Sequence, residues 1–186
     1  QKVSDPYRWL ENFTDDEVKE WVGLQNNYSQ QFLKNRFQKS IKQDLELIWT
    51  SEYLSTPFKV GEKIFYYFNT GKLEQNRLMI RDCESCPERI LIDPNDFSND
   101  GTISLASVSV SPNAQWIAFA KSDGGSDWRT WKIMNITSGE ILDDEIEWSK
   151  FSSAEWSPDS KGFFYRKYLK PDGEELLDLN LSLIHI

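Results

Sequence analysis

The sequence is poor in the residues that build metal centres and disulfide networks. It holds two cysteines, Cys83 and Cys86, and one histidine, His185. Structural zinc takes four ligands, and this Cys-x-x-Cys has no second pair to complete such a set. A redox pair favours a helix N-terminus, whereas Pro87 and a predicted strand follow here. We therefore expect no metal, no cofactor, and a plain solvent-exposed loop at the two cysteines.

Long apolar runs and basic clusters are also absent. No stretch approaches the roughly 20 apolar residues that a membrane span requires. The formal net charge of −9 disfavours nucleic acid or an anionic membrane as a partner. Neither a glycine-rich phosphate loop nor paired catalytic carboxylates stand out. We expect no nucleic-acid partner, no membrane partner, a cytoplasmic location, and a natural start upstream of Gln1, which is not a methionine.

The sequence does contain a repeated motif. Residues 110–119 read VSPNAQWIAF and residues 156–165 read WSPDSKGFFY, with their Ser-Pro pairs about 46 residues apart. A fainter copy, VGEKIFYY, occupies residues 60–67. Repeats with a period of about 40 to 50 residues in a strand-rich chain are typical of propeller blades, which must stack to bury both faces.

The first 50 residues predict two amphipathic helices. Thr14 and Glu17 fit a capping box, so a helix is expected over residues 15–35. Ser40 and Gln43 repeat that logic for a second, shorter helix. Pro57 then ends the helical part. The apolar positions at helical spacing are Val18, Trp21, Val22, Tyr28 and Phe32 in the first helix and Ile41, Leu45, Ile48 and Trp49 in the second.

Short strands separated by turn residues follow the helices. The predicted strands are residues 63–69, 77–82, 89–93, 104–110, 115–121, 129–135 and 140–142, with 151–155 and 162–168 opening the next unit. Because no helices separate them, neighbouring strands should pair antiparallel within each blade. The acidic run of Asp143, Asp144, Glu145 and Glu147 could repel or admit peptides, but a solvated turn is the favoured interpretation.

Several motifs in this order carry a resemblance to a known family. They are residues 5–11 (DPYRWLE), 65–71 (FYYFNTG), 75–77 (QNR), 91–95 (LIDPN), 100–102 (DGT), 125–128 (GSDW) and 150–152 (KFS). On these motifs the chain resembles the prolyl oligopeptidase family of serine peptidases from residue 5 to about residue 173. Each motif alone is weak evidence, whereas their shared order makes the resemblance specific.

The resemblance implies a mainly β fold with an N-terminal helical segment. Residues 1–53 would be the N-terminal arm of an α/β-hydrolase catalytic domain. Residues 54–180 would be the first blades of a β-propeller, about two blades plus the start of a third. Residues 181–186 look foreign, because they are similar to the translation of a sequencing adapter. The α/β-hydrolase domain would then be an intramolecular partner of this segment.

The family's chemistry implies a serine endopeptidase that cleaves short peptides on the C-terminal side of proline. The present part would gate substrate access and clamp the domains together. The family's serine lies on a Gly-x-Ser-x-Gly elbow, which this sequence lacks, and His185 lies in the suspect tail. We therefore assign no catalytic residue here and expect the segment alone to be inactive. A non-catalytic propeller scaffold and a related oligopeptidase that cleaves after basic residues remain alternatives.

Two residues match substrate-side positions of the family. Phe151 matches a propeller phenylalanine that lines the substrate pocket, where its aromatic face can pack against an apolar side chain of the peptide, although a core aromatic at a strand start is the competing interpretation. The full-length protein would take short proline-containing peptides as partners. Asp127 matches a loop carboxylate near the domain junction, where it could pair with a basic residue of the hydrolase domain. Its competing interpretation is an aspartate that caps a turn.

Overall fold

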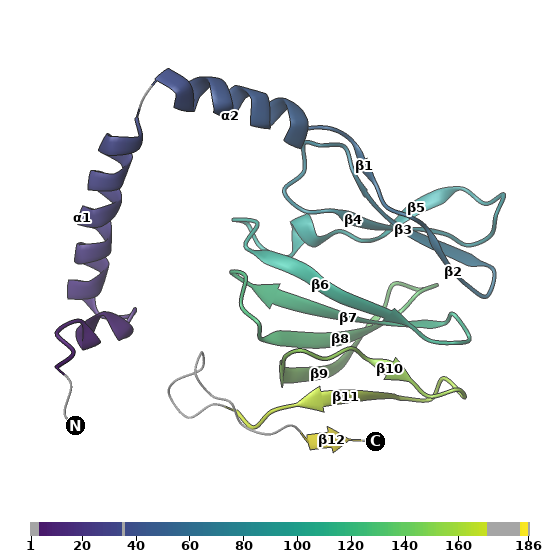
Figure 1. Cartoon of the computed structure of the whole chain (residues 1–186). Coiled ribbons are helices and arrows are strands. Elements are labelled where there is room, and N and C mark those ends of the chain that lie inside the picture. The colour runs from purple at the N-terminus through teal and green to yellow at the C-terminus, as the bar shows by residue number, and fades with distance from the viewer. Residues whose placement is uncertain (1–3, 35, 171–182, 186) are drawn as a thin grey trace. The chain divides into compact units, whose positions relative to one another are not determined.

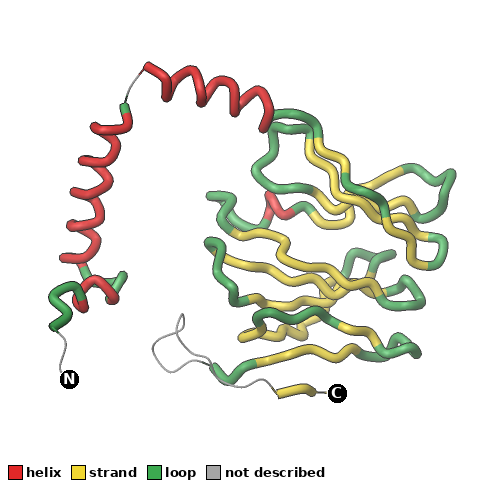
Figure 2. The backbone as a smooth tube through the Cα atoms, in the orientation of Figure 1, coloured by secondary structure: helices red, strands yellow, loops and turns green. Residues whose placement is uncertain are grey.

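A computed structural model describes residues 4–34, 36–170 and 183–185 of the chain. The chain divides into two compact units, residues 1–50, called here the helical unit, and residues 51–186, called the sheet unit. Figure 1 labels the elements of each unit, and Figure 2 shows helices in the first and mostly strands in the second.

The helical unit contains a 3₁₀ turn η1 (Arg8–Glu11), helix α1 (Asp16–Leu33) and helix α2 (Arg36–Trp49). Asp15 caps α1, because its carboxylate accepts a hydrogen bond from the Glu17 amide at 2.9 Å. The predicted capping box is therefore wrong, since the Thr14 hydroxyl is engaged by Asn12 at 2.7 Å. The cap predicted at Ser40 is also wrong, because α2 begins four residues earlier and encloses that position.

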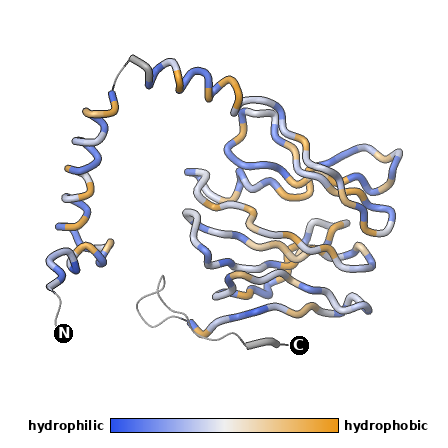
Figure 3. Tube along the Cα trace, in the orientation of Figure 1, coloured by the Kyte–Doolittle hydropathy of each residue, from blue (hydrophilic) through white to orange (hydrophobic). Residues whose placement is uncertain are grey.

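The apolar residues of both helices are largely exposed. Only Val18 is buried among the described residues of α1, and Trp21 meets Trp9 edge to face at 6.2 Å. Figure 3 shows hydrophobic residues recurring along both helices. Exposed apolar residues are Tyr28, Phe32, Leu33, Ile41, Leu45, Leu47, Ile48 and Trp49. In the described part of the chain, neither helix is long and apolar enough to span a bilayer.

The strands of the sheet unit form three antiparallel sheets. The first comprises β1 (Tyr53–Leu54), β2 (Phe58–Val60), β3 (Lys63–Asn69), β4 (Arg77–Arg81) and β5 (Glu88–Ile92). The second comprises β6 (Ile103–Val110), β7 (Trp116–Asp123), β8 (Arg129–Asn135) and β9 (Ile141–Ser149). The third comprises β10 (Glu155–Trp156), β11 (Phe163–Lys167) and β12 (Leu183–His185). A 3₁₀ turn, η2 (Pro94–Asp96), precedes the second sheet.

The two Ser-Pro motifs each form the connection between two neighbouring strands of a sheet. One connects β6 to β7 and the other connects β10 to β11. The Ser111 amide donates to the Trp116 carbonyl, and the Ser157 amide donates to the Gly162 carbonyl, both at 2.9 Å. Each serine hydroxyl also bonds the side chain two residues later at 2.7 Å. The repeat in the sequence is thus a repeated turn, one per sheet.

Neighbouring sheets pack against each other and are also joined by hydrogen bonds. Between the first two sheets, the Arg89 guanidinium donates to the Ile136 carbonyl at 2.9 Å. Between the second and third, the Trp156 indole donates to the Ser109 carbonyl at 3.0 Å. The core between the first two sheets is formed by Phe65, Leu78, Ile80, Ile92, Ile117, Phe119, Met134 and Ile136. The described β part is therefore a stack of partial propeller blades, as the sequence predicts.

Two local expectations are wrong. The acidic run is not a turn, because β9 continues through it to Ser149. Ile146 points to the core between the second and third sheets, while Glu145 pairs with Lys132 at 3.3 Å. Charged side chains on such a terminal strand suit a sheet edge. The cysteine loop is also more than a plain loop, since a disulfide joins Cys83 and Cys86.

Two of the predicted domain boundaries can be compared with the observed strands. β1 begins at Tyr53, inside the segment that the sequence assigns to the N-terminal arm. Residues 183–185 of the tail form β12, which pairs antiparallel with β11. The other tail residues lie outside the described part of the chain.

Candidate functional site

The two predicted site residues flank one end of the second sheet. Arg129, at the start of β8, pairs in register with Ser149, at the end of β9. Asp127 lies just before that pair and Phe151 just after it. The antiparallel pairing of β8 and β9 therefore brings two loops together that are more than twenty residues apart in the sequence.

The segment after β9 is held from several directions. The buried Ser149 hydroxyl accepts a hydrogen bond from the Trp131 indole at 3.2 Å. The Ser152 carbonyl accepts from the Arg129 guanidinium at 3.3 Å, and the Ser152 hydroxyl accepts from the Arg166 amide at 3.0 Å. Contacts from the second and the third sheet thus fix the backbone on both sides of Phe151.

Lys150 lies between aromatic rings. Its side chain is buried, and Nζ sits 4.1 Å from the Trp128 ring centroid and 5.1 Å from that of Tyr168. The Trp128 ring meets both Trp148 and Tyr168 edge to face at 5.6 Å. A desolvated ammonium over aromatic faces is stabilised by the ring quadrupoles. We call Lys150 with Trp128, Trp148 and Tyr168 the lysine cage.

Phe151 projects from a left-handed backbone next to this cage. Its φ is 50°, and Trp148 also has a positive φ of 59°. Bulky residues rarely adopt this region, which costs about 1–3 kcal/mol and persists only where the surroundings impose it. The Phe151 ring is 63% exposed and belongs to a bend rather than a strand. The interpretation as a core aromatic is therefore wrong, and an exposed ring is available for contact.

Asp127 is exposed in the loop between β7 and β8. The turn there is closed by other residues, because the Ser126 amide donates to the Asp123 carbonyl at 2.8 Å and the Ser126 hydroxyl accepts from the Trp128 amide at 3.1 Å. No described group hydrogen-bonds the Asp127 carboxylate, so its interpretation as a turn cap is also wrong.

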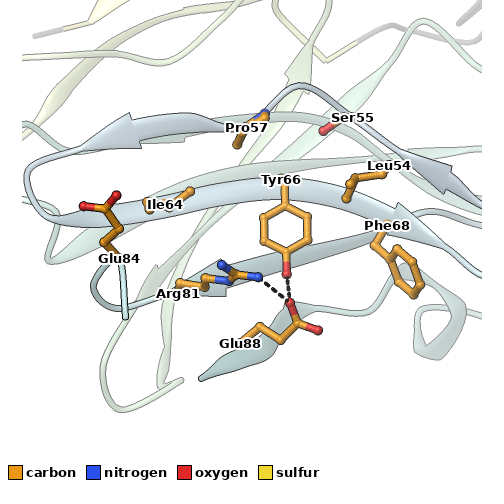
Figure 4. Close-up of a pocket in the computed structure, with 9 residues that line it drawn as sticks. All are labelled: Leu54, Ser55, Pro57, Ile64, Tyr66, Phe68, Arg81, Glu84 and Glu88. Atoms are coloured by element: carbon orange, nitrogen blue, oxygen red, sulfur yellow. Dashed lines mark hydrogen bonds and ion pairs between the residues drawn. The ribbon is translucent and has the colours of Figure 1, made fainter. Parts of the chain in front are cut away.

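A separate hollow of about 460 Å³ lies on the first sheet. Figure 4 shows the Tyr66 hydroxyl and the Arg81 guanidinium converging on the Glu88 carboxylate. The lining residues are Leu54, Ser55, Pro57, Ile64, Tyr66, Phe68, Arg81, Glu84 and Glu88. The alternation of β3 places Ile64, Tyr66 and Phe68 opposite Phe65, which faces the core. That alternation was the available signal for a hollow that the sequence reasoning missed.

The polar groups of this hollow shift one another's pKa values. Burial and the hydrogen bond to Glu88 raise the pKa of Tyr66. Hydrogen bonds from Tyr66 and Arg81 lower the pKa of the Glu88 carboxyl. The three groups satisfy each other and include no activated nucleophile. Within the described ranges, no three His, Cys, Asp or Glu side chains gather as a metal site.

Lowering the pH should destabilise the first sheet, because it protonates the Asp93 carboxylate. Burial raises the pKa of Asp93, but hydrogen bonds from Asn95 and Arg77 outweigh it and lower the pKa overall; the Arg77 Nε lies 2.6 Å from the carboxylate. A depressed native pKa gives stability that is complete above about pH 4 and is lost as the pH falls further. Urea unfolding at pH 7 should show Asp93→Asn destabilised by about 2 kcal/mol.

That deficit should shrink as the pH falls below about 4, because the wild-type carboxylate is then protonated too. Asp144→Asn, an exposed carboxyl of β9, is the matched control and should track the wild type throughout. A deficit that stays constant down to pH 2 would contradict the linkage.

Known proteins share this arrangement of two helices followed by stacked antiparallel sheets. The family model described as the prolyl oligopeptidase N-terminal beta-propeller domain matches residues 1–182. The chain belongs to the prolyl oligopeptidase family. The match covers the helical unit and the stacked sheets together, so both are parts of this family's N-terminal propeller region.

Relatives of this family give the same result. The prolyl endopeptidase of Elizabethkingia miricola is 38% identical over 177 residues, which cover 94% of this chain and 25% of that protein. A structure from a mechanistic study of two prolyl endopeptidases matches with a TM-score of 0.85 at 33% identity, covering 92% of this chain and 26% of that one. The prolyl oligopeptidase B of Galerina marginata, solved with a 35mer hydrolysis and macrocyclization substrate, matches with a TM-score of 0.82 at 25% identity, covering 98% of this chain and 29% of that one. The chain thus spans about a quarter of the length of these relatives.

Proposed function

We propose that this chain is the substrate-admitting and domain-clamping part of a serine endopeptidase that cleaves short peptides on the C-terminal side of proline. The observation that carries the proposal is the family match over residues 1–182, which spans both units. Relatives of the same family named prolyl endopeptidases are about four times longer, which leaves room for a catalytic domain.

We assign a separate role to each of the two units. The helices expose apolar residues that need a covering surface, which we assign to an α/β-hydrolase domain of the same protein. The stacked sheets would admit only small peptides to the catalytic site, because folded proteins do not fit a narrow propeller channel. Phe151 would pack against a substrate side chain, and Asp127 would pair with a basic residue of the hydrolase domain. The serine, histidine and aspartate of acyl transfer would lie outside this chain.

The experiment is a specificity assay on the full-length protein. Fluorogenic peptides that differ only in the residue before the scissile bond, proline, arginine or alanine, are compared for kcat/KM. We expect the proline peptide to be preferred by at least about a hundredfold, and a fluorophosphonate to abolish the activity by phosphonylating the catalytic serine, with fluoride as the leaving group. Preference for arginine would assign the protein to an oligopeptidase that cleaves after basic residues. Absence of any hydrolysis would favour a binding scaffold.

The 186-residue chain serves as the control in the same assay. It should show no hydrolysis above background, because it contains no Gly-x-Ser-x-Gly. Measurable fluorophosphonate-sensitive hydrolysis by this chain would contradict the assignment of catalysis to the missing part.

A further inference from the structure

An exposed aromatic residue with a left-handed backbone directly follows a buried lysine. Phe151 has a φ of 50° and is 63% exposed, whereas the preceding residue, Lys150, is only 7% exposed. Phe151 lies in a bend, and its positive φ shows that the backbone turns at this residue. Nothing in the Phe151 side chain favours this conformation, so the surroundings must impose it.

The lysine cage supplies that constraint. Lys150 is drawn inward because its Nζ lies over the faces of Trp128 and Tyr168 at 4.1 and 5.1 Å. The Tyr168 amide donates to the Trp148 carbonyl at 2.7 Å, which ties the far wall of the cage to the segment before Lys150. With Lys150 held inward and a positive φ at the next residue, the Phe151 side chain is directed to solvent.

The hydrogen bonds of Ser152 close the turn on its other side. Its carbonyl and hydroxyl are held by Arg129 of the second sheet and Arg166 of the third. The bend therefore has two fixed ends and one cation anchor at its centre. Of these, only the anchor lies over aromatic rings, and a substitution of Lys150 removes neither of the two donors to Ser152, so the anchor is separable by mutation.

We propose that Lys150 is a positioning residue that, through the lysine cage, presents the Phe151 ring to the peptide substrate in one fixed orientation. This inference deepens the proposed function and rests on its assignment of Phe151 as a substrate contact. A ring fixed before binding loses less conformational freedom on contact, so the cage raises affinity without touching the peptide. Lys150 itself need not reach the substrate.

The test uses the full-length protein with two readouts. Steady-state kinetics are measured with a peptide long enough to reach Phe151 and with a truncated peptide that does not. In parallel, 4-fluorophenylalanine is placed at position 151 and its ¹⁹F resonance is recorded. The variants are Lys150→Met, which keeps an unbranched side chain one atom shorter and removes the charge, Lys150→Arg, which keeps the cation, and Phe151→Ala.

We expect Phe151→Ala to raise KM for the long peptide by about tenfold, with kcat and the truncated peptide little changed. Lys150→Met should raise KM severalfold in the same selective way and broaden or split the ¹⁹F resonance. Lys150→Arg should restore most of both. The double variant Lys150→Met/Phe151→Ala should be no worse than Phe151→Ala, because the two residues act through one contact.

The control is Lys132→Met, which removes a lysine of the same sheet that pairs with Glu145 rather than with aromatic rings. It should leave KM and the resonance unchanged. Tyr168→Leu, which removes one cage wall and keeps the lysine, should reproduce Lys150→Met and replaces it if that variant does not fold.

The outcomes distinguish a failure of the positioning role from a failure of the proposed substrate contact. If Phe151→Ala raises KM but Lys150→Met behaves like Lys132→Met, the positioning role is refuted and the proposed substrate contact stands. If Phe151→Ala leaves KM unchanged in an active enzyme, the proposed contact is refuted, and with it the positioning role. A changed resonance without a changed KM in Lys150→Met would show a cage that orders the turn but serves no substrate.

Discussion

Trp49→Ala is expected to destabilise the full-length protein by about 3–5 kcal/mol, the usual loss for a buried tryptophan. In the present chain Trp49 is 85% exposed at the end of α2. If a further domain covers the apolar face of this helix, as proposed, the side chain becomes buried there and its loss leaves a cavity. The measurement is urea unfolding of the full-length protein.

Two comparisons make this result specific. Gln43→Ala, at an exposed polar position of the same helix, should change the free energy of unfolding by less than about 0.5 kcal/mol. Trp49→Ala in the 186-residue chain should be nearly as silent, because the ring is 85% exposed in the described part of that chain. Equal, small effects of both substitutions in the full-length protein would show that the helix face stays uncovered, and the clamp would be refuted.

Phe119→Ala is expected to loosen two sheets at once and to cost about 3–5 kcal/mol. Phe119 is 1% exposed in the core between the first and second sheets. It stacks on Phe97 at 6.3 Å, and Lys121 Nζ lies 3.8 Å from that ring. Because a single blade cannot bury both of its faces, a cavity in this core should weaken both sheets.

Amide hydrogen exchange distinguishes shared from local destabilisation. In Phe119→Ala, protection should fall in β3 and β4 as well as in β7 and β8. Ile141→Ala, which truncates a 48% exposed residue on β9, is the control and should leave β3 and β4 protected. Faster exchange confined to the second sheet would mean that the sheets are independent units rather than stacked blades.

Periodicity alone predicted most of the elements. The expected strands at 63–69 and 129–135 coincide with β3 and β8, because alternation and flanking turns were unambiguous there. The cap of α1 was misplaced by one residue, since Thr14 and Asp15 both suit the position and only the backbone decides between them. β9 was cut short because its charges resemble a turn when its edge position is unknown.

The site was harder to predict because it depends on pairing rather than on local sequence. Phe151 and Asp127 were predicted from the family motifs, and their exposure came only from the structure. The lysine cage assembles Trp128, Trp148 and Tyr168 from three segments whose proximity follows from the register of β8 and β9 and from the third sheet. No spacing rule in the sequence connects residues so far apart.

Sequencing the coding region downstream of residue 180 is the most direct test of the peptidase assignment. We expect several hundred further residues, first with more Ser-Pro turns at intervals of about 40–50 residues and then with a Gly-x-Ser-x-Gly followed by an aspartate and a histidine. A reading frame that completes the remaining blades and stops without that motif would contradict the peptidase assignment and leave a binding scaffold.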